Sequence, residues 1–459
     1  MKTTKSKLFI VSIISFLICT ACESFTEVDT PQSQLTTAAV FENAATAEGA
    51  MIDIYARIRE EGMVNGSFSG LSSLMSNYSD EMQFFGSSEE IKQFNNHTIL
   101  SSNSLVLSLW NASYSEIYAT NLLLEGLKKS TAIDLVDKER LTGEALFLRA
   151  FIHFNLVNVF GDIPYITTTD YLKNTQIQKL SQEKVWQHII EDLIQAEKLL
   201  PQDYPTSERV RANKTVATAM LARVYLYKKD WTNAAVKATA VIENPTYVWV
   251  ANPALEFLRE SKAIIWALHP GFIGANTKDA RTFVFSKGPP TKPALSPQFV
   301  ASFEPGDQRR SQWIRTVTSA NESWPYAYKY KKTLGSTPPQ EYTILFRLAE
   351  QYLIRAEALA HLNNIPGSQG DFNKIRNRAG LLNTSASTVE SLLNAVAIER
   401  RSELFTEQGH RWFDLKRTKQ AQEVLEPLKS EWKNSQLLLP IPQSELLLNK
   451  NLLPQNPGY

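Results

Sequence analysis

Hydrophobic positions recur at the spacing of an α-helix through most of the chain. The clearest stretch is 137–160, in which Phe147, Phe151 and Phe154 fall at i, i+4 and i+7 and form one apolar stripe. Gly161 follows directly, which predicts that the helix ends there. Comparable patterns predict helices over 48–61, within 98–129, and over 182–200, 213–228, 231–243, 341–362, 369–378 and 388–407.

Three segments lack this periodicity. Residues 23–34 are polar and read as a tether, while 62–96 carry four glycines among Ser and Asn and predict a loop. Residues 245–340 hold clustered prolines and many aromatics, with a short strand-like run at 263–268. The pattern therefore predicts a loop-rich insertion between two helical regions.

A weak internal repeat runs through the helices. Leu221, Ala222, Tyr225 and Ala234 match the spacing of the tetratricopeptide pattern, although Ala238 stands where that pattern has a large aromatic. Two ordinary antiparallel helices packed by small residues are the alternative, and we favour the repeat. The predicted fold class is mainly α: a tetratricopeptide-like helical repeat scaffold with a loop-rich inserted lobe.

The N-terminus has the order of a secretory signal. Three lysines precede an apolar run of 14 residues that ends at Ala21, which is shorter than the ~20 residues that span a bilayer. The run into Cys22 resembles a bacterial lipobox, except that Cys19 stands where Leu is usual. We predict a signal peptide over 1–21, a lipid on Cys22 and a tether over 22–35.

Composition narrows the choice of function. The chain has two cysteines, so a lipidated protein without its signal peptide has no thiol left for a disulfide. The formal net charge of +1 lacks the basic character of nucleic-acid binding. The six histidines are scattered and no metalloprotease, nucleophile-elbow or phosphate-loop motif occurs, so we predict no metal, cofactor or catalytic residues. Two carboxylates that meet in space to hydrolyse a glycoside stay open.

A charged stretch near the C-terminus has two interpretations. Arg400, Arg401, His410 and Arg411 are candidates for an anion site. The alternative is a structural ion-pair network, in which carboxylates present in near-equal number pair with those arginines. We favour the network, with the carboxylates supplied by Glu399, Glu403 and Asp414.

Six ordered blocks carry a family resemblance. They are Trp110-x3-Tyr114-x2-Ile117-x3-Asn121; Glu144-Ala145-x3-Arg149-Ala150-x4-Asn155 to Pro164; Arg347-Leu348-Ala349-Glu350-x2-Leu353-x2-Ala356-Glu357-Ala358; Glu399-Arg400-Arg401-x-Glu403-Leu404; Gly409 to Leu415; and Leu439-Pro440-Ile441-Pro442-x2-Glu445 with the Asn456-Pro457-Gly458-Tyr459 end. With the lipobox-like start, the set resembles the SusD/RagB family of Bacteroidetes outer-membrane lipoproteins.

The resemblance implies a cell-surface nutrient-binding lipoprotein of the outer membrane, not an enzyme. Members capture oligosaccharides, or in some cases peptides, and pass them to a TonB-dependent β-barrel transporter of the SusC kind. The implied regions are an N-terminal SusD-like helical region over 36–244, the variable insertion over 245–340 and a C-terminal RagB/SusD helical region over 341–459.

The ligand-binding residues must be sought outside the shared motifs. Sugars stack on flat aromatic rings, and binding residues concentrate on loops held by a rigid scaffold. Two regions meet both conditions, and from them we predict ligand contacts by Asp80, Phe84, Phe85, Trp324, Tyr326 and Tyr328, with Trp249 and Trp313 as lesser candidates. Core packing is the alternative for each aromatic.

The leading hypothesis is a glycan-capturing lipoprotein. Peptide capture by the same uptake system is the runner-up, favoured if the insertion's aromatics are buried. A surface glycosidase and a helical scaffold that docks only proteins are further alternatives.

Overall fold

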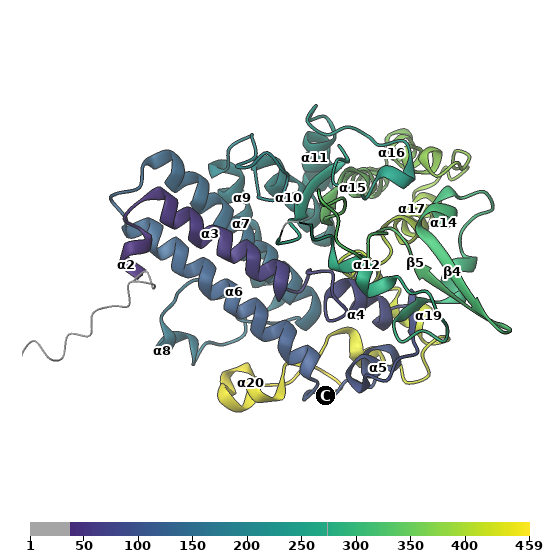
Figure 1. The fold of residues 1–459 in the computed structure, drawn as a ribbon, viewed down its shortest axis with the longest axis horizontal. Helices are drawn as coiled ribbons and strands as arrows, with labels where there is room; N and C mark the ends of the chain where they lie inside the picture. Colours follow the sequence, from purple (N-terminus) through teal and green to yellow (C-terminus); the bar gives the residue numbers. More distant parts are fainter. Residues whose placement is uncertain (1–36, 273) are drawn as a thin grey trace, which may run out of the picture.

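The structure is a computed structural model that describes residues 37–459 apart from residue 273. The signal peptide 1–21, lipidated Cys22 and tether 22–35 therefore lie outside the described residues. Helices dominate the described part, together with three two-stranded antiparallel sheets (Figure 1). The predicted mainly α class is confirmed.

Long helices build the N-terminal half (Figure 1). Asn43, Asn103 and Asp134 each accept a hydrogen bond from backbone N–H groups of the first turn that follows, which satisfies donors that a helix leaves unpaired. The helices are α2 (Thr37–Val40), α3 (Ala44–Glu60), α6 (Ser104–Lys129), α7 (Leu135–Phe160), α8 (Tyr171–Asn174), α9 (Gln182–Leu199), α10 (Lys214–Tyr227) and α11 (Trp231–Ile242).

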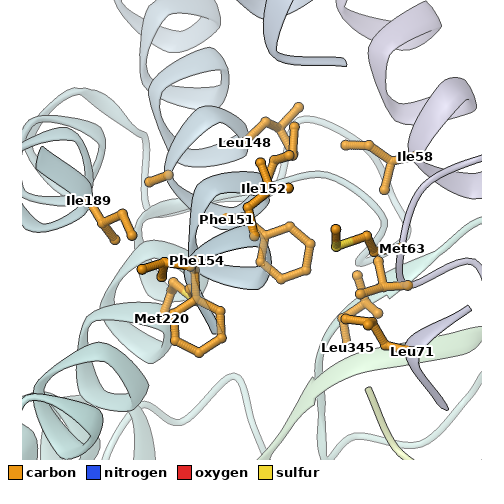
Figure 2. Close-up of a cluster of buried hydrophobic side chains, with 14 of the residues drawn as sticks. Ile58, Met63, Leu71, Leu148, Phe151, Ile152, Phe154, Ile189, Met220 and Leu345 are labelled. Carbon is orange, nitrogen blue, oxygen red and sulfur yellow. The ribbon is translucent and has the colours of Figure 1, made fainter. Parts of the chain in front are cut away.

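Helix α7 is the centre of this half. It is buried on nearly all faces from Leu141 onward because α6 packs on one side and α9 on another. Gly161, with φ of 79°, follows its last residue, as the sequence predicted. Figure 2 shows how distant segments meet around it: Ile58, Met63, Leu71, Leu148, Phe151, Ile152, Phe154, Ile189, Met220 and Leu345.

Helix pairs continue from this core into the C-terminal half. α10 packs against α11, α11 against α15 (Leu348–His361), and α15 against α16 (Ile365–Arg378) and α17 (Val389–Leu404). Ala238, the residue that departs from the repeat pattern, is fully buried in one cluster with Ala358 of α15. The small side chain at this position therefore suits the packing of α11 on α15.

The glycine-rich segment 62–96 is not a loop, and this prediction was wrong. It contains α4 (Leu71–Tyr78), strand β1 (Met82–Phe84) and α5 (Glu89–Asn96). Every residue of α4 is buried, including the Ser and Asn side chains that weaken an isolated helix, and Ser72 Oγ accepts a hydrogen bond from the backbone N–H of distant Gln408. Packing thus overrides intrinsic propensity.

The insertion carries its own small core and more regular structure than its sequence predicts. Strand β2 (Ile264–Leu268) confirms the predicted strand-like run, and it pairs with β6 (Thr343–Arg347). The helix predicted over 341–362 therefore begins only at α15, after β6. The other elements are η1 (Pro253–Leu255), α12 (Lys278–Phe283), β3 (Pro293–Leu295), α13 (Pro297–Ala301), α14 (Gln308–Trp313), β4 (Ile314–Ser319) and β5 (Glu322–Ala327).

The C-terminal segment closes the molecule against the end of α7. The side-chain amide of Asn456 donates to the carbonyl oxygens of Phe160 and Leu439, each at 2.7 Å. These two hydrogen bonds give the C-terminal Asn-Pro-Gly-Tyr segment a structural role. The remaining elements are α18 (His410–Arg417), α19 (Ala421–Leu425), η2 (Asn434–Leu437), α20 (Gln443–Leu448) and η3 (Lys450–Leu452).

Candidate functional site

Strand pairing joins the two regions in which ligand contacts were predicted. β1 runs antiparallel to β3, with Phe84 opposite Pro293 and Met82 opposite Leu295. β3 in turn packs against β5, which carries Tyr326. The first glycine-rich segment and the insertion therefore form one continuous region of the molecule.

Phe84 separates two hollows in this region. One, of about 510 Å³, is lined by Phe68, Phe84, Ile91 and several polar side chains. The other, of about 600 Å³, is lined by Phe84, Phe85 and the amides of Gln83, Asn95 and Asn96, among others. We call Phe68, Phe84 and Phe85 the Phe84 group.

The Phe84 group presents aromatic surface to solvent. Phe85 is 47% exposed and Phe68 is 56% exposed, while Phe84 is half-buried. A Cβ at Gly86 would lie 2.4 Å from Cζ of Phe84, so only glycine allows the chain to pass this ring. The sequence analysis missed Phe68, although it stands in a Ser- and Gly-rich segment just as Phe85 does.

A second aromatic group lies on the insertion. The rings of Phe285 and Tyr326 have centroids 4.8 Å apart, and those of Tyr326 and Tyr328 are 5.9 Å apart. All three are half-buried, and the Arg315 guanidinium lies 5.0 Å from the Tyr328 ring centroid. We call Phe285, Tyr326 and Tyr328 the Tyr326 group. Its partly open rings are available to a ligand.

The segment after Tyr328 fixes this group to the scaffold. The Lys329 ammonium is buried, where it donates to the backbone oxygens of Glu403 and Phe405 at 2.8 Å and to Glu407 Oε1 at 2.5 Å. Burial lowers the pKa of Lys329 to about 8, although Glu407 opposes the shift. The insertion is therefore anchored to the end of α17 directly beside the half-buried Tyr328.

Two of the predicted ligand residues are withdrawn from the surface. Trp324 is 6% exposed, and its ring covers Gly288 so closely that a Cβ there would lie 2.0 Å from Cζ3. Asp80 is 5% exposed and accepts from Arg411 Nε at 2.7 Å and pairs with Arg401. The structure therefore places Trp324 and Asp80 in the interior, and the candidate site is built without them.

Electrostatics agree with a structural role for Asp80. Burial by itself raises the pKa of this carboxyl, but Arg411 and Arg401 outweigh burial and lower the pKa. The lesser candidate Trp313 is also fully buried, in the core of the insertion, and Trp249 stacks edge-on against Tyr352. Phe84, Phe85, Tyr326 and Tyr328 remain as accessible predicted residues.

The charged C-terminal motifs form a structural ion-pair network, but mostly with partners other than those predicted. Asp414 pairs with Arg400 as expected, whereas Arg401 and Arg411 pair with Asp80 and not with Glu399 or Glu403. Glu403 is fully buried and pairs with Arg309, Arg347 and Arg378, which hold its pKa well below the usual range in spite of burial. His410 is buried as well. Arg401 and Arg411 are both taken up by Asp80, whereas Nδ1 of His410 has no hydrogen-bond partner among the described residues; Arg400 is discussed below.

Neither a metal centre nor a membrane-crossing helix emerges from the described residues. Across 37–272 and 274–459, no three His, Cys, Asp or Glu side chains converge as metal ligands. Over the same ranges no helix combines the length and apolar character needed to cross a bilayer.

Fold and site together define a helical-repeat scaffold that presents aromatic side chains from an inserted lobe. A family profile described as "Starch-binding associating with outer membrane" matches residues 29–226, and one described as "SusD family" matches residues 311–459. The chain belongs to the SusD/RagB family.

Relatives of known sequence or structure agree over nearly the full length. SusD-like protein P2 of Formosa agariphila is 28% identical, over 98% of this chain and 99% of the relative. A SusD superfamily protein from Bacteroides vulgatus superposes with a TM-score of 0.79 at 23% identity, covering 91% of this chain and 99% of that protein. A laminarin-binding SusD-like protein gives a TM-score of 0.78 at 26% identity, covering 91% and 100%.

Proposed function

We propose that the protein binds a glycan at the cell surface and passes it unchanged to a TonB-dependent, SusC-like β-barrel of the outer membrane. The observation that carries the proposal is that the Phe84 group, with exposed Phe68 and Phe85, and the half-buried Tyr326 group lie on one region of a helical scaffold. In this proposal Cys22 carries the lipid that holds the protein at the membrane.

The chemistry of the site suits a carbohydrate. The C–H faces of a sugar ring stack on flat aromatic rings, and neighbouring amides take its hydroxyl groups. Phe85 supplies such a ring, and the hollow that it lines also contains the amides of Gln83, Asn95 and Asn96. The proposed role is capture without catalysis, and the electrophoresis experiment below tests it by asking whether the polysaccharide is shortened.

The comparisons support a glycan as the ligand class. One structural relative is named for laminarin binding, and another, from Bacteroides thetaiotaomicron, is named as a surface glycan-binding protein. The partner barrel is proposed from the family alone. Peptide capture is the second candidate and is kept as an outcome of the test, because Tyr326 and Tyr328 are half-buried and not fully withdrawn from solvent.

Native affinity electrophoresis of residues 23–459 tests the proposal. We expect one polysaccharide in a panel that includes laminarin and starch to retard the protein, without any shortening of that polysaccharide. Shortening would indicate a glycosidase. Failure of every glycan to retard the protein, with retardation by peptides, would overturn the proposed ligand class.

A substitution localises the binding. Phe85→Ala should weaken glycan affinity by about tenfold, because it removes a stacking ring. Its melting temperature should stay unchanged because the side chain is 47% exposed. Tyr171→Ala, which truncates a 74% exposed aromatic on α8, is the matched control. Equal loss of affinity in both variants would contradict the assignment.

A further inference from the structure

A separate cavity of about 380 Å³ opens among the helices of the repeat scaffold. Its walls come from the end of α10, the start of α11, and from α15, α17 and α18. It shares no lining residue with the two hollows around Phe84. The proposed glycan site therefore leaves it unexplained.

One side of this cavity carries hydrogen-bonding groups that the protein does not satisfy. Arg400 is 1% exposed; its Nε donates to Asp414 Oδ2 at 2.8 Å, but Nη1 and Nη2 have no hydrogen-bond partner. The buried hydroxyl of Tyr227 also has none. Buried guanidinium N–H groups normally find acceptors, so this arrangement points to an acceptor from outside the chain.

The Tyr227 hydroxyl lies in the same electrostatic environment as Arg400. Its ring packs 5.2 Å from the ring of Phe154, and the charges that act on its hydroxyl are those of Asp414, Arg400, Arg417 and Arg223. Burial is the main reason that the pKa of Tyr227 is raised. The hydroxyl therefore stays protonated at neutral pH and is able to donate.

The charges around the cavity leave an excess of one positive charge. Asp414 is shared by Arg400 and Arg417, and Glu357 pairs with Arg417. Arg411 is committed to Asp80. Since Lys229 at the rim has no ion-pair partner among the described residues, three cations face two carboxylates.

The excess of one positive charge favours an anion that carries a single negative charge. A carboxylate carries a single charge and matches the two Nη groups of a guanidinium in bidentate geometry. A phosphate brings close to two charges and would repel Asp414 and Glu357. The lining also holds Leu393 and Ala397, on the same helix as Arg400, and Trp231 at the start of α11, and these apolar side chains suit a compact organic body on the carboxylate.

We propose that this cavity binds a small organic carboxylate, with Arg400 and Tyr227 holding its oxygens and Lys229 attracting it to the rim. The charged motif of the C-terminal region then has two roles: Arg401 and Arg411 hold Asp80, while Arg400 serves the ligand. An acidic sugar and an acidic amino acid share the required chemistry.

Titration calorimetry with sodium glucuronate and with sodium glutamate, each with a net charge of −1 at neutral pH, tests the proposal. The compound that binds more tightly shows whether the ligand is an acidic sugar or an acidic amino acid. Glucose and sodium sulfate are the comparators. We expect binding of at least one carboxylate at millimolar concentration and no binding of glucose. Binding of neither carboxylate, or sulfate binding as tight as theirs, would overturn the proposed ligand class.

Tyr227→Phe separates this role from a structural one. It removes a hydroxyl that has no partner in the protein, so the urea midpoint should hold, whereas carboxylate affinity should fall by about fivefold. Unchanged affinity in this variant would refute the assignment.

Two lysines provide a matched pair for the rim. Lys229 and Lys419 are both exposed, both follow a helix, and both have φ of 61°. Lys229→Gln should weaken carboxylate binding about twofold at low salt, and Lys419→Gln, outside the cavity lining, should not. Equal effects of the two changes would show a general charge effect and no site.

Discussion

Glu116 on α6 is a buried carboxyl that makes folding depend on pH. It is 3% exposed, and its Oε1 has no hydrogen-bond partner. A Cβ at Gly62 would lie 2.7 Å from that oxygen, which shows how tightly the chain covers it. Burial, with a smaller contribution from Glu61, raises the pKa of Glu116 to about 8, while Arg57 opposes the shift.

The sign and size of the effect follow from this pKa. The unfolded chain loses the proton near pH 4.5, whereas the folded protein keeps it to about pH 8. Stability contributed by Glu116 is fully present below pH 4.5 and is lost as pH rises to about 8. At pH 7 the loss is roughly 3 kcal/mol, at about 1.4 kcal/mol per pH unit.

Glu116→Gln should remove this pH dependence because the amide does not ionise. We expect the free energy of unfolding at pH 7 to rise by roughly 3 kcal/mol and to change little at pH 5. Urea denaturation of both proteins at pH 5, 6, 7 and 8 measures this, with the exposed Glu139→Gln as control. If wild type and Glu116→Gln keep the same slope against pH, the reasoning is refuted.

Two further predictions concern stability. Trp324→Ala should lower the free energy of unfolding by about 3 kcal/mol, because the ring is buried against Gly288. A binding titration should show that any loss of glycan affinity follows from this destabilisation. Loss of glycan affinity at unchanged stability would restore Trp324 as a ligand contact. Asn456→Ala should lower the free energy of unfolding, measured in urea, by about 2 kcal/mol, because it leaves the carbonyl oxygens of Phe160 and Leu439 without their donor. An unchanged urea midpoint would show that the C-terminal segment does not stabilise α7.

The helices were predictable where periodicity and end signals coincide. The segment 137–160 became α7 because its apolar spacing and Gly161 give the same answer. The prediction of a loop over 62–96 was wrong because α4 is stabilised by burial against the rest of the protein, which its Gly, Ser and Asn content does not reveal. Likewise, the start of α15 depends on the partner strand β2, which lies far away in sequence.

The candidate site was predictable as a region more than residue by residue. Loop aromatics correctly marked Phe85 and Tyr326 as accessible, because short aromatic-rich segments at a lobe surface cannot bury every ring. The burial of Trp324 was not predictable, because its ring packs on Gly288, which comes from a different loop. The burial of Asp80 was not predictable either, because its partners Arg401 and Arg411 lie more than 300 residues away in the sequence.

The β1–β3 pairing has a consequence for how specificity can change. Since Phe84 stands opposite Pro293 in the antiparallel β1–β3 pair, neither segment can be exchanged without its partner. If residues 245–340 alone were grafted into a relative, the β1 strand of the recipient would have to pair with a β3 strand from another protein. Recombination or design that alters ligand preference must therefore move both segments as one inheritable unit, although about 200 residues separate them in the chain.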